Sequence, residues 1–178
     1  HFLFNTMNNL YSLSLEESSK TSEGIAKTAE LLRSVLYECD DSEIPLEKEL
    51  NLVENYIELE KMRYGKGLVF DFNVVGAVKA HKIAPMLLFT FIENSFKHGC
   101  GNNSGKSTIS VYLEANSQRI KFTTKNNKSE KRTGNLKKSG GIGLKNAKKR
   151  LEIIYPKRHR LTISEDDEFF KLNLEIWK

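Results

Sequence analysis

The sequence predicts an α+β protein, in which a helical hairpin precedes an α/β sandwich of helices packed on one face of a sheet. Two features of the apolar pattern predict this class. Apolar residues recur every three or four positions through the first 36 residues and again in three later segments, as they do on helices. From Leu68 onward, other short segments alternate apolar with polar residues, as strands do. We place the boundary between the two regions, 1–42 and 43–178, in the polar interval that ends near residue 43.

The N-terminal region contains two amphipathic patterns separated by a polar break at residues 16–24. Their apolar positions are Leu3, Met7 and Leu10 in the first pattern, and Ile25, Ala29, Leu32 and Leu36 in the second. Two helices with a short connection form an antiparallel hairpin, and two such hairpins bury their apolar faces as a four-helix bundle. The sequence therefore predicts a homodimer that forms through the N-terminal helices.

The second region begins with a third amphipathic helix, which follows Pro45 and ends near Tyr64. Alternation with a period of two then predicts strands at 68–74, 109–113, 120–124, 161–163 and 170–176. We expect strands that are neighbours in the chain to form hairpins, with three helices against one face of the sheet.

The remaining part of the chain is organised around residues 84–99, an apolar run that predicts a buried helix. Pro85 suits the first helical turn, and Gly99 can end the helix in the left-handed conformation. This helix ends in an unusual group of polar residues, which has two interpretations.

On a helix, Asn94, Lys97 and His98 share a face, and Glu93 lies one turn before Lys97. In the first interpretation, Glu93 and Lys97 form an exposed ion pair and the other residues cap the helix. In the second, the cluster is a hydrogen-bonded network or a site for a polar ligand, because unsatisfied buried polar groups cost roughly 1–3 kcal/mol each.

A glycine-rich turn favours the second interpretation. Residues 140–144 read Gly-Gly-Ile-Gly-Leu and stand directly before an amphipathic helix. Glycines let the backbone approach a phosphate, and a helix N-terminus offers N–H groups to an anion. A single Gly-x-Gly is weak support, so its value lies in the pairing with the Asn94 helix. Gly105-Lys106-Ser107 is not a P-loop, because Gly101 is one position out of register and a strand follows in place of a helix.

Composition and cysteine usage set the outer limits. Hydrophobic content of 39% and charged content of 29% are typical of a soluble globular protein. No window approaches the roughly 18 apolar residues of a membrane span, and the start at His1 indicates a fragment of a longer chain. Cys39 and Cys100 match no metal-binding spacing, so we expect free thiols in a reducing compartment.

The net charge of +5 is concentrated in one segment. Between residues 125 and 138 there are six basic residues against a single acid, Glu130. This segment is interpreted either as a solvated loop or as a flexible basic lid over a polyanion. It has no interleaved aromatic residues, so we do not expect a nucleic-acid partner.

The order of these motifs resembles the ATP-binding domain of sensor histidine kinases, which has the Bergerat-type fold of gyrase and Hsp90-like ATPases. The opening sequence His-Phe-Leu-Phe-Asn at residues 1–5 resembles the phosphoacceptor box of the LytS-type sensor kinases. Residues 56–65 and the Gly-Leu-Lys-Asn at 143–146 also resemble that group. The resemblance covers essentially the whole chain.

The resemblance implies that ATP and Mg²⁺ are bound and that His1 accepts the phosphoryl group. Asn94 would coordinate Mg²⁺, and Glu93 beside it would order or deprotonate a metal-bound water. The remaining implied nucleotide-binding residues are Lys97 and His98 for phosphate or ribose, Gly141 and Gly143 for backbone contacts to phosphate, and Leu144 of the same motif. His81 and His159 have no such context and are expected at the surface.

One position departs from the resemblance. Related kinases usually carry an Asp-x-Gly-x-Gly turn after the second hairpin strand, and its Asp accepts the adenine amino group. The corresponding segment, 124–128, reads Thr-Lys-Asn-Asn-Lys. Asn126 could accept that hydrogen bond, less strongly than a carboxylate would.

The expected function is that of the cytoplasmic transmitter portion of an inner-membrane two-component sensor kinase, anchored through segments absent from this sequence. It would phosphorylate His1 from ATP and pass the phosphoryl group to an aspartate on the receiver domain of a response regulator. The alternative is a catalytically weak or dead dimeric scaffold, which loss of the adenine-binding Asp favours.

Overall fold

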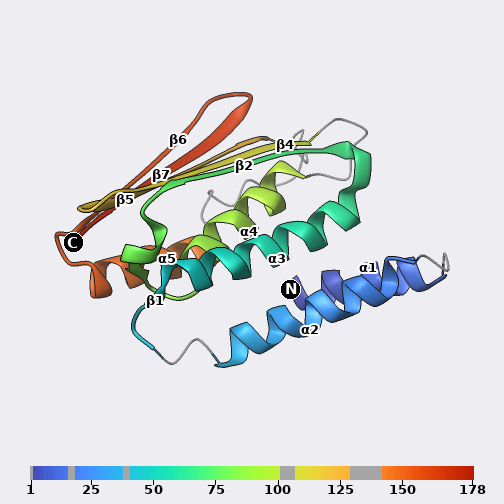
Figure 1. The fold of residues 1–178 in the computed structure, drawn as a ribbon. Coiled ribbons are helices and arrows are strands. Elements are labelled where there is room, and N and C mark those ends of the chain that lie inside the picture. Colours follow the sequence, from blue (N-terminus) through green and yellow to red (C-terminus); the bar gives the residue numbers. More distant parts are fainter. Residues whose placement is uncertain (1, 16–18, 38–40, 101–106, 129–141) are drawn as a thin grey trace.

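A mixed five-stranded sheet covered on one face by three helices forms the larger part of the structure (Figure 1). This is a computed structural model that describes residues 2–15, 19–37, 41–100, 107–128 and 142–178. Its helices are α1 (Phe2–Leu15), α2 (Thr21–Tyr37), α3 (Leu46–Tyr64), α4 (Leu87–Gly99) and α5 (Ile142–Ile154). The strands are β1 (Ile44–Pro45), β2 (Leu68–Gly76), β3 (Lys82–Ile83), β4 (Ser107–Ala115), β5 (Arg119–Asn127), β6 (His159–Glu165) and β7 (Phe169–Trp177).

The strands of the large sheet lie in the order β2-β4-β5-β7-β6. All neighbours are antiparallel except β2 and β4, which run parallel, with Leu68 opposite Ser107. The predicted hairpins β4–β5 and β6–β7 are present, whereas the parallel β2–β4 pair was not expected from the alternation pattern. Because α4 connects these two strands, it must lie against the sheet.

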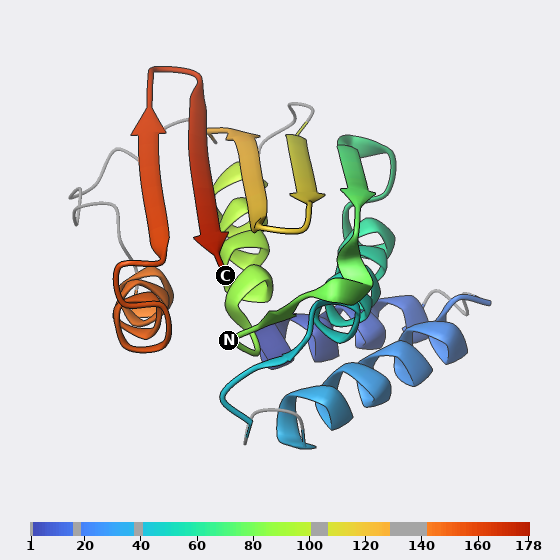
Figure 2. The same cartoon turned by 60° about the vertical axis from the view of Figure 1, so that its left-hand side comes forward.

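The three helices α3, α4 and α5 lie side by side beneath the sheet (Figure 2). Helix α4 is central and packs on β4 and β5, which explains why its first two turns are almost wholly apolar. Leu88, Ile92 and Phe122 are fully buried between these layers. The predicted α+β sandwich is confirmed.

The hairpin of α1 and α2 lies on the outer side of α3, so that the molecule has three layers (Figure 1). Leu31 of α2 is fully buried in the common core, and Lys27 forms an ion pair with Glu58 of α3. Within the hairpin, a Cβ on Gly24 would stand 2.6 Å from Leu10 Cδ2, so the two helices approach closely there. Helix α2 begins at Thr21, inside the predicted polar break. The boundary near residue 42 stays a prediction.

Three expectations for single residues can be compared with the structure. His81 was expected at the surface, but this is wrong: it is 6% exposed, and its Nε2 lies 2.5 Å from the Asn116 carbonyl oxygen. His159 is half-buried beside the Tyr155 carbonyl oxygen. Cys100 is a buried free thiol, and burial raises its pKa to about 11, while Cys39 lies outside the described residues.

Within the described ranges, no helix combines the length and the apolar character that a membrane crossing requires.

Candidate functional site

Asn94 lies where α4 meets the first turn of α5. Its side-chain Nδ2 donates to the carbonyl oxygen of Thr90, one turn earlier, at 2.7 Å. A Cβ placed on Gly143 would stand 3.8 Å from that Nδ2 and 3.5 Å from Thr90 Cγ2. The structure therefore brings together two motifs that are far apart in the sequence. Because Nδ2 is bonded to the helix, the carboxamide oxygen is the Asn94 atom that can meet a ligand.

A second contact between α5 and α4 fixes their relative direction. Arg150 of α5 donates from Nη1 to the carbonyl oxygen of Pro85, just before α4, at 2.6 Å. Gly143 thus lies beside the middle of α4 and Arg150 beside its beginning, so the two helices run antiparallel. This arrangement places the first turn of α5 beside Asn94, and the N–H groups of a helix's first turn have no partners within the helix.

The N-terminus of α4 is capped by a buried carboxylate from another helix. Glu49 of α3 is fully buried and accepts hydrogen bonds from the backbone N–H of Met86 at 2.8 Å and of Phe89 at 3.1 Å. Met86 adopts the left-handed conformation, with φ of 61°, so α4 begins at Leu87, two residues after Pro85. Burial raises the pKa of Glu49 to about 7, although the backbone N–H groups of Phe89 and Met86 act in the opposite direction.

At its other end, α4 approaches β5 closely. A Cβ on Gly99 would stand 2.9 Å from Asn126 Cβ, 3.2 Å from Nδ2 and 3.3 Å from Cγ. No side chain fits at the first of these distances. The expected left-handed conformation of Gly99 is wrong, because its φ is not in that region. Glycine is needed at this position for the approach of Asn126 and not for a left-handed turn.

Asn126 and Thr124 occupy the face of β5 that is turned toward α4, and each is 1% exposed. Asn126 Nδ2 donates to the carbonyl oxygen of Asn127 at 2.9 Å. Asn126 Oδ1 and Thr124 Oγ1 are buried and have no hydrogen-bond partner among the described residues. An unsatisfied buried polar atom costs roughly 1–3 kcal/mol, so two such atoms on one strand face need an explanation.

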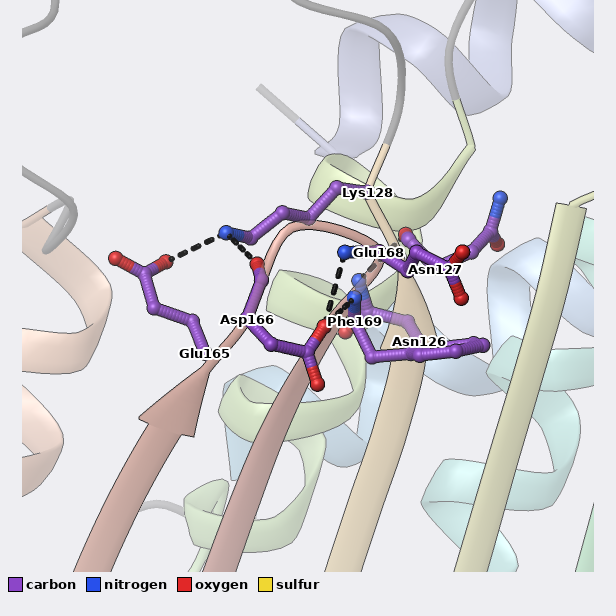
Figure 3. A network of polar contacts seen from close by, with 7 residues as sticks. All are labelled: Asn126, Asn127, Lys128, Glu165, Asp166, Glu168 and Phe169. Atoms are coloured by element: carbon purple, nitrogen blue, oxygen red, sulfur yellow. Dashed lines mark hydrogen bonds and ion pairs between the residues drawn. The ribbon is translucent and has the colours of Figure 1, made fainter.

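Figure 3 shows how the end of β5 is held beside Asn126. The Lys128 side chain donates to the Asp166 carbonyl oxygen and pairs with Glu165 at 3.4 Å. The Lys125 ammonium lies 3.8 Å from the centre of the Phe169 ring. Two of the six basic residues predicted for a lid are therefore engaged by the β6–β7 hairpin. The other four lie outside the described residues.

Glu93, Lys97 and His98 lie on α4 between the two ends of the candidate site. Glu93 is half-buried and its charge acts on Tyr56 and Glu60 of α3. Lys97 and His98 are exposed. Although His98 as a whole is exposed, its imidazole is partly desolvated; this desolvation and the neighbouring Lys97 lower the pKa of His98, which favours the neutral imidazole at pH 7.

The other predicted site residues divide into two groups. Leu144 is 7% exposed and belongs to the hydrophobic core, directly after Gly143. His1 and Gly141 lie outside the described residues.

No group of three His, Cys, Asp or Glu side chains gathers to hold a metal within the described part of the chain. The Asn94 carboxamide oxygen is nevertheless a hard ligand of the kind that Mg²⁺ prefers, and Mg²⁺ commonly takes one or two protein ligands together with substrate phosphates. The residues present therefore fit a metal ion that is shared with phosphate.

Sequence reasoning missed Glu49, Arg150 and Thr124. Glu49 and Arg150 looked like ordinary charged residues on amphipathic helices, and their partners are backbone groups far away in the sequence. A signal existed for Thr124, because it stands at an inward position of β5, two residues before Asn126 and two after Phe122.

A concave region of about 340 Å³ lies at the opposite end of the sheet, near the start of β5 and the end of β7. His81, Tyr155 and Arg158 are among its lining residues. It includes none of the predicted site residues, so it is separate from the candidate site.

Comparisons with known proteins give a consistent result. A family model described as "Histidine kinase" matches residues 1–68. The sensor protein LytS of Enterococcus faecalis is 26% identical over 165 residues, covering 87% of this chain and 28% of that protein. The sensor protein LytS of Staphylococcus saprophyticus is 25% identical over 186 residues, covering 99% of this chain and 32% of that protein.

Solved structures show the same fold. A structure titled as a bacterial phosphotransferase gives a TM-score of 0.57 at 13% identity, covering 98% of this chain and 90% of that one. The catalytic domain of histidine kinase ThkA gives 0.53 at 14% identity, covering 76% and 94%. ThkA in complex with the response regulator TrrA gives 0.51 at 12% identity, covering 99% and 58%.

The chain spans about a quarter to a third of the length of these curated relatives. The predicted resemblance to LytS-type sensor histidine kinases is confirmed, as is the fold of a histidine kinase catalytic domain.

Proposed function

We propose that this relative of the LytS-type sensor histidine kinases is the cytoplasmic transmitter portion of an inner-membrane two-component sensor. It binds Mg-ATP and moves the γ-phosphoryl group to His1. The observation that carries the proposal is the close approach of the Asn94 side chain to Gly143 in the first turn of α5, where an added Cβ would stand 3.8 Å from Asn94 Nδ2. This approach supports a site in which the Asn94 carboxamide oxygen meets the metal beside a phosphate-binding helix N-terminus.

In the proposed site, different residues along α4 contact different parts of the nucleotide. Asn94 holds the metal through its carboxamide oxygen, and backbone N–H groups at Gly141 and Gly143 bind phosphate. Exposed Lys97 and His98 contact phosphate or ribose, and Leu144 anchors the glycine turn in the core. Mg²⁺, when bound, would neutralise phosphate charge. Positioning of the γ-phosphoryl group and its acceptor would contribute most of the remaining catalysis.

The adenine base would bind at the C-terminal end of α4. Asn126 is buried beside Gly99 and its Oδ1 has no partner among the described residues, and an acceptor is what the adenine amino group needs. Asn126 therefore takes the place of the expected Asp.

His1 is the proposed acceptor of the phosphoryl group. A neutral imidazole has a nucleophilic nitrogen at physiological pH, because the ordinary pKa of His is about 6.5. Glu93, half-buried next to Asn94, would orient a water that accompanies Mg²⁺ into the site. These two roles depend on the resemblance.

The exposed face of α1 supports a homodimer. Met7, Tyr11 and Leu15 are 45%, 66% and 67% exposed and recur every four residues, so they form one apolar stripe. A second hairpin would cover this stripe as a four-helix bundle. The phosphoryl group would then pass to an aspartate on a response-regulator receiver domain, a kind of partner with which ThkA has been solved.

The second candidate function is a catalytically weak or dead dimeric scaffold. It is favoured by Asn126, because a neutral amide accepts a hydrogen bond from adenine less strongly than a carboxylate does.

The test is calorimetric titration with ATP, with and without Mg²⁺, of the wild type, Asn94→Ala and Asn51→Ala. Asn51 is an exposed helical position of α3 and serves as the matched control. Asn94→Ala should keep its unfolding midpoint and lose magnesium-dependent binding, and its phosphoryl transfer should fall about 100-fold or more. His1→Gln should bind ATP normally and lose labelling. Wild-type labelling of Asn94→Ala would contradict the role of Asn94, and absence of wild-type binding at millimolar ATP would favour the scaffold.

A further inference from the structure

The inward face of β5 changes character along the strand. Its buried positions are Ile120, Phe122, Thr124 and Asn126. The first two are apolar and belong to the core, where Phe122 packs on Phe91 of α4 with ring centres 6.2 Å apart. The last two are polar, and both carry a buried oxygen without a partner in the described part of the chain.

The two orphaned atoms differ in what they can offer a ligand. The Nδ2 of Asn126 is occupied by the Asn127 carbonyl oxygen, so Oδ1 offers an acceptor alone. The Thr124 hydroxyl can also donate a hydrogen bond. Since the two residues are i and i+2 on one strand, their side chains point in the same direction. The strand therefore presents an acceptor and a donor on one face, about 6.6 Å apart along the strand, a spacing that one water can help to bridge.

Adenine carries the complementary pair on one edge, because its amino group donates and the neighbouring ring nitrogen N1 accepts. Guanine and hypoxanthine have an oxygen acceptor and an N1–H donor at the same two places. An oxygen of the base would then face Asn126 Oδ1, and two acceptors do not bond. The pair of residues thus favours adenine over the 6-oxo purines.

We propose that Thr124 is a specificity-determining residue of the nucleotide site: its hydroxyl donates a hydrogen bond to the N1 edge of adenine, directly or through one water, while Asn126 accepts from the amino group. This inference depends on the proposed function, since it needs nucleotide to bind beside α4. The fold alone gives the Thr124 hydroxyl no partner among the described residues, and adenine would provide one.

The experiment compares Thr124→Val with Thr123→Val in the full 178-residue chain. Valine keeps the shape of threonine and removes the hydroxyl. Thr123 is the matched control because it lies on the opposite face of β5, where its Oγ1 donates to Asn173 Oδ1 at 3.0 Å. For each variant we would measure urea unfolding without nucleotide and the Kd for ADP and IDP in the presence of Mg²⁺.

Thr124→Val should be at least as stable as the wild type without nucleotide, because it removes an unsatisfied buried group. It should also bind ADP about tenfold more weakly and lose part of the preference for ADP over IDP. Thr123→Val should lose stability and keep the wild-type Kd.

Two outcomes distinguish a failure of the Thr124 inference from a failure of the proposed function. A Thr124→Val variant that loses stability and binds ADP as the wild type does would overturn the inference and leave the proposed function standing. A wild type that binds neither nucleotide would overturn both.

Discussion

The two ends of α4 differ in whether the buried polar groups beside them have hydrogen-bond partners among the described residues. At the N-terminal end, Glu49 accepts from two backbone N–H groups and Arg150 donates to the Pro85 carbonyl oxygen. At the C-terminal end, Thr124 and Asn126 each bury an oxygen that no described residue satisfies. A satisfied network needs nothing further, whereas buried atoms without partners need an explanation, and the one we propose here is a bound nucleotide. The contacts at the first end hold the helix in place, and binding is the role proposed for the second.

The contrast between the two ends of α4 would be wrong if substitutions at the N-terminal end weakened nucleotide binding more than they lowered the free energy of unfolding. The largest effect is expected for Glu49→Ala, which leaves the buried N–H groups of Met86 and Phe89 without an acceptor. We expect a loss of about 4 kcal/mol in the free energy of unfolding at pH 6, measured by urea denaturation. Glu47→Ala, on the exposed side of the same helical turn, should change stability by less than about 0.5 kcal/mol. Equal stabilities of the two variants would contradict the capping role of Glu49.

Titration of Glu49 provides the second test. Its pKa is raised from 4.5 to about 7 by burial, so the folded state binds this proton more tightly than the unfolded state does. Stability from this group is therefore greatest at low pH and falls as pH rises from about 4.5 to 7, by about 3 kcal/mol in full. Glu49→Gln cannot titrate.

The measurement for this second test is the difference in unfolding free energy between the wild type and Glu49→Gln at several pH values. As pH rises from 4.5 to 7, the unfolding free energy of the wild type should fall relative to that of Glu49→Gln. If the two curves run parallel across this range, the pKa of Glu49 is not raised.

The third and smallest change in stability is expected at the C-terminal end. Gly99→Ala places a Cβ 2.9 Å from Asn126 Cβ, so the last turn of α4 must move away from β5. We expect about 2 kcal/mol of lost stability, and a proportionally larger loss of nucleotide affinity in titration with ADP. Gly67→Ala is the control, because its Cβ would meet no atom within 4 Å. Unchanged ADP binding by Gly99→Ala would show that the Asn126 end takes no part in the site.

The same contrast explains what the sequence could and could not predict. Local periodicity was sufficient for the helices, for the β4–β5 and β6–β7 hairpins and for the α+β class, because each depends on residues that are close in the chain. The parallel pairing of β2 with β4 could not be predicted in this way, since alternation shows which face is buried and not which strand is the neighbour.

For the candidate site, residue chemistry led to Asn94 and Gly143, and the family resemblance led to Asn126. Where these residues lie relative to one another could not be predicted, because it depends on where α5 and β5 meet α4. Gly99 shows what the local sequence cannot predict. The sequence correctly marked it as the end of the helix, but the reason for a glycine lies in a side chain on a distant strand.

The parallel pairing of β2 with β4 also has a consequence for the order of folding. Strands β4 and β5 are joined by a short turn, and β6 and β7 by another, so these hairpins can form early from local contacts. Strand β2 pairs with β4 only when the connection that contains α4 crosses beneath the sheet, because parallel neighbours need a crossover. Pairing of β2 and docking of the helix that carries Asn94 are therefore coupled, and we expect an unfolding event that releases β2 to release this helix from one of its supports.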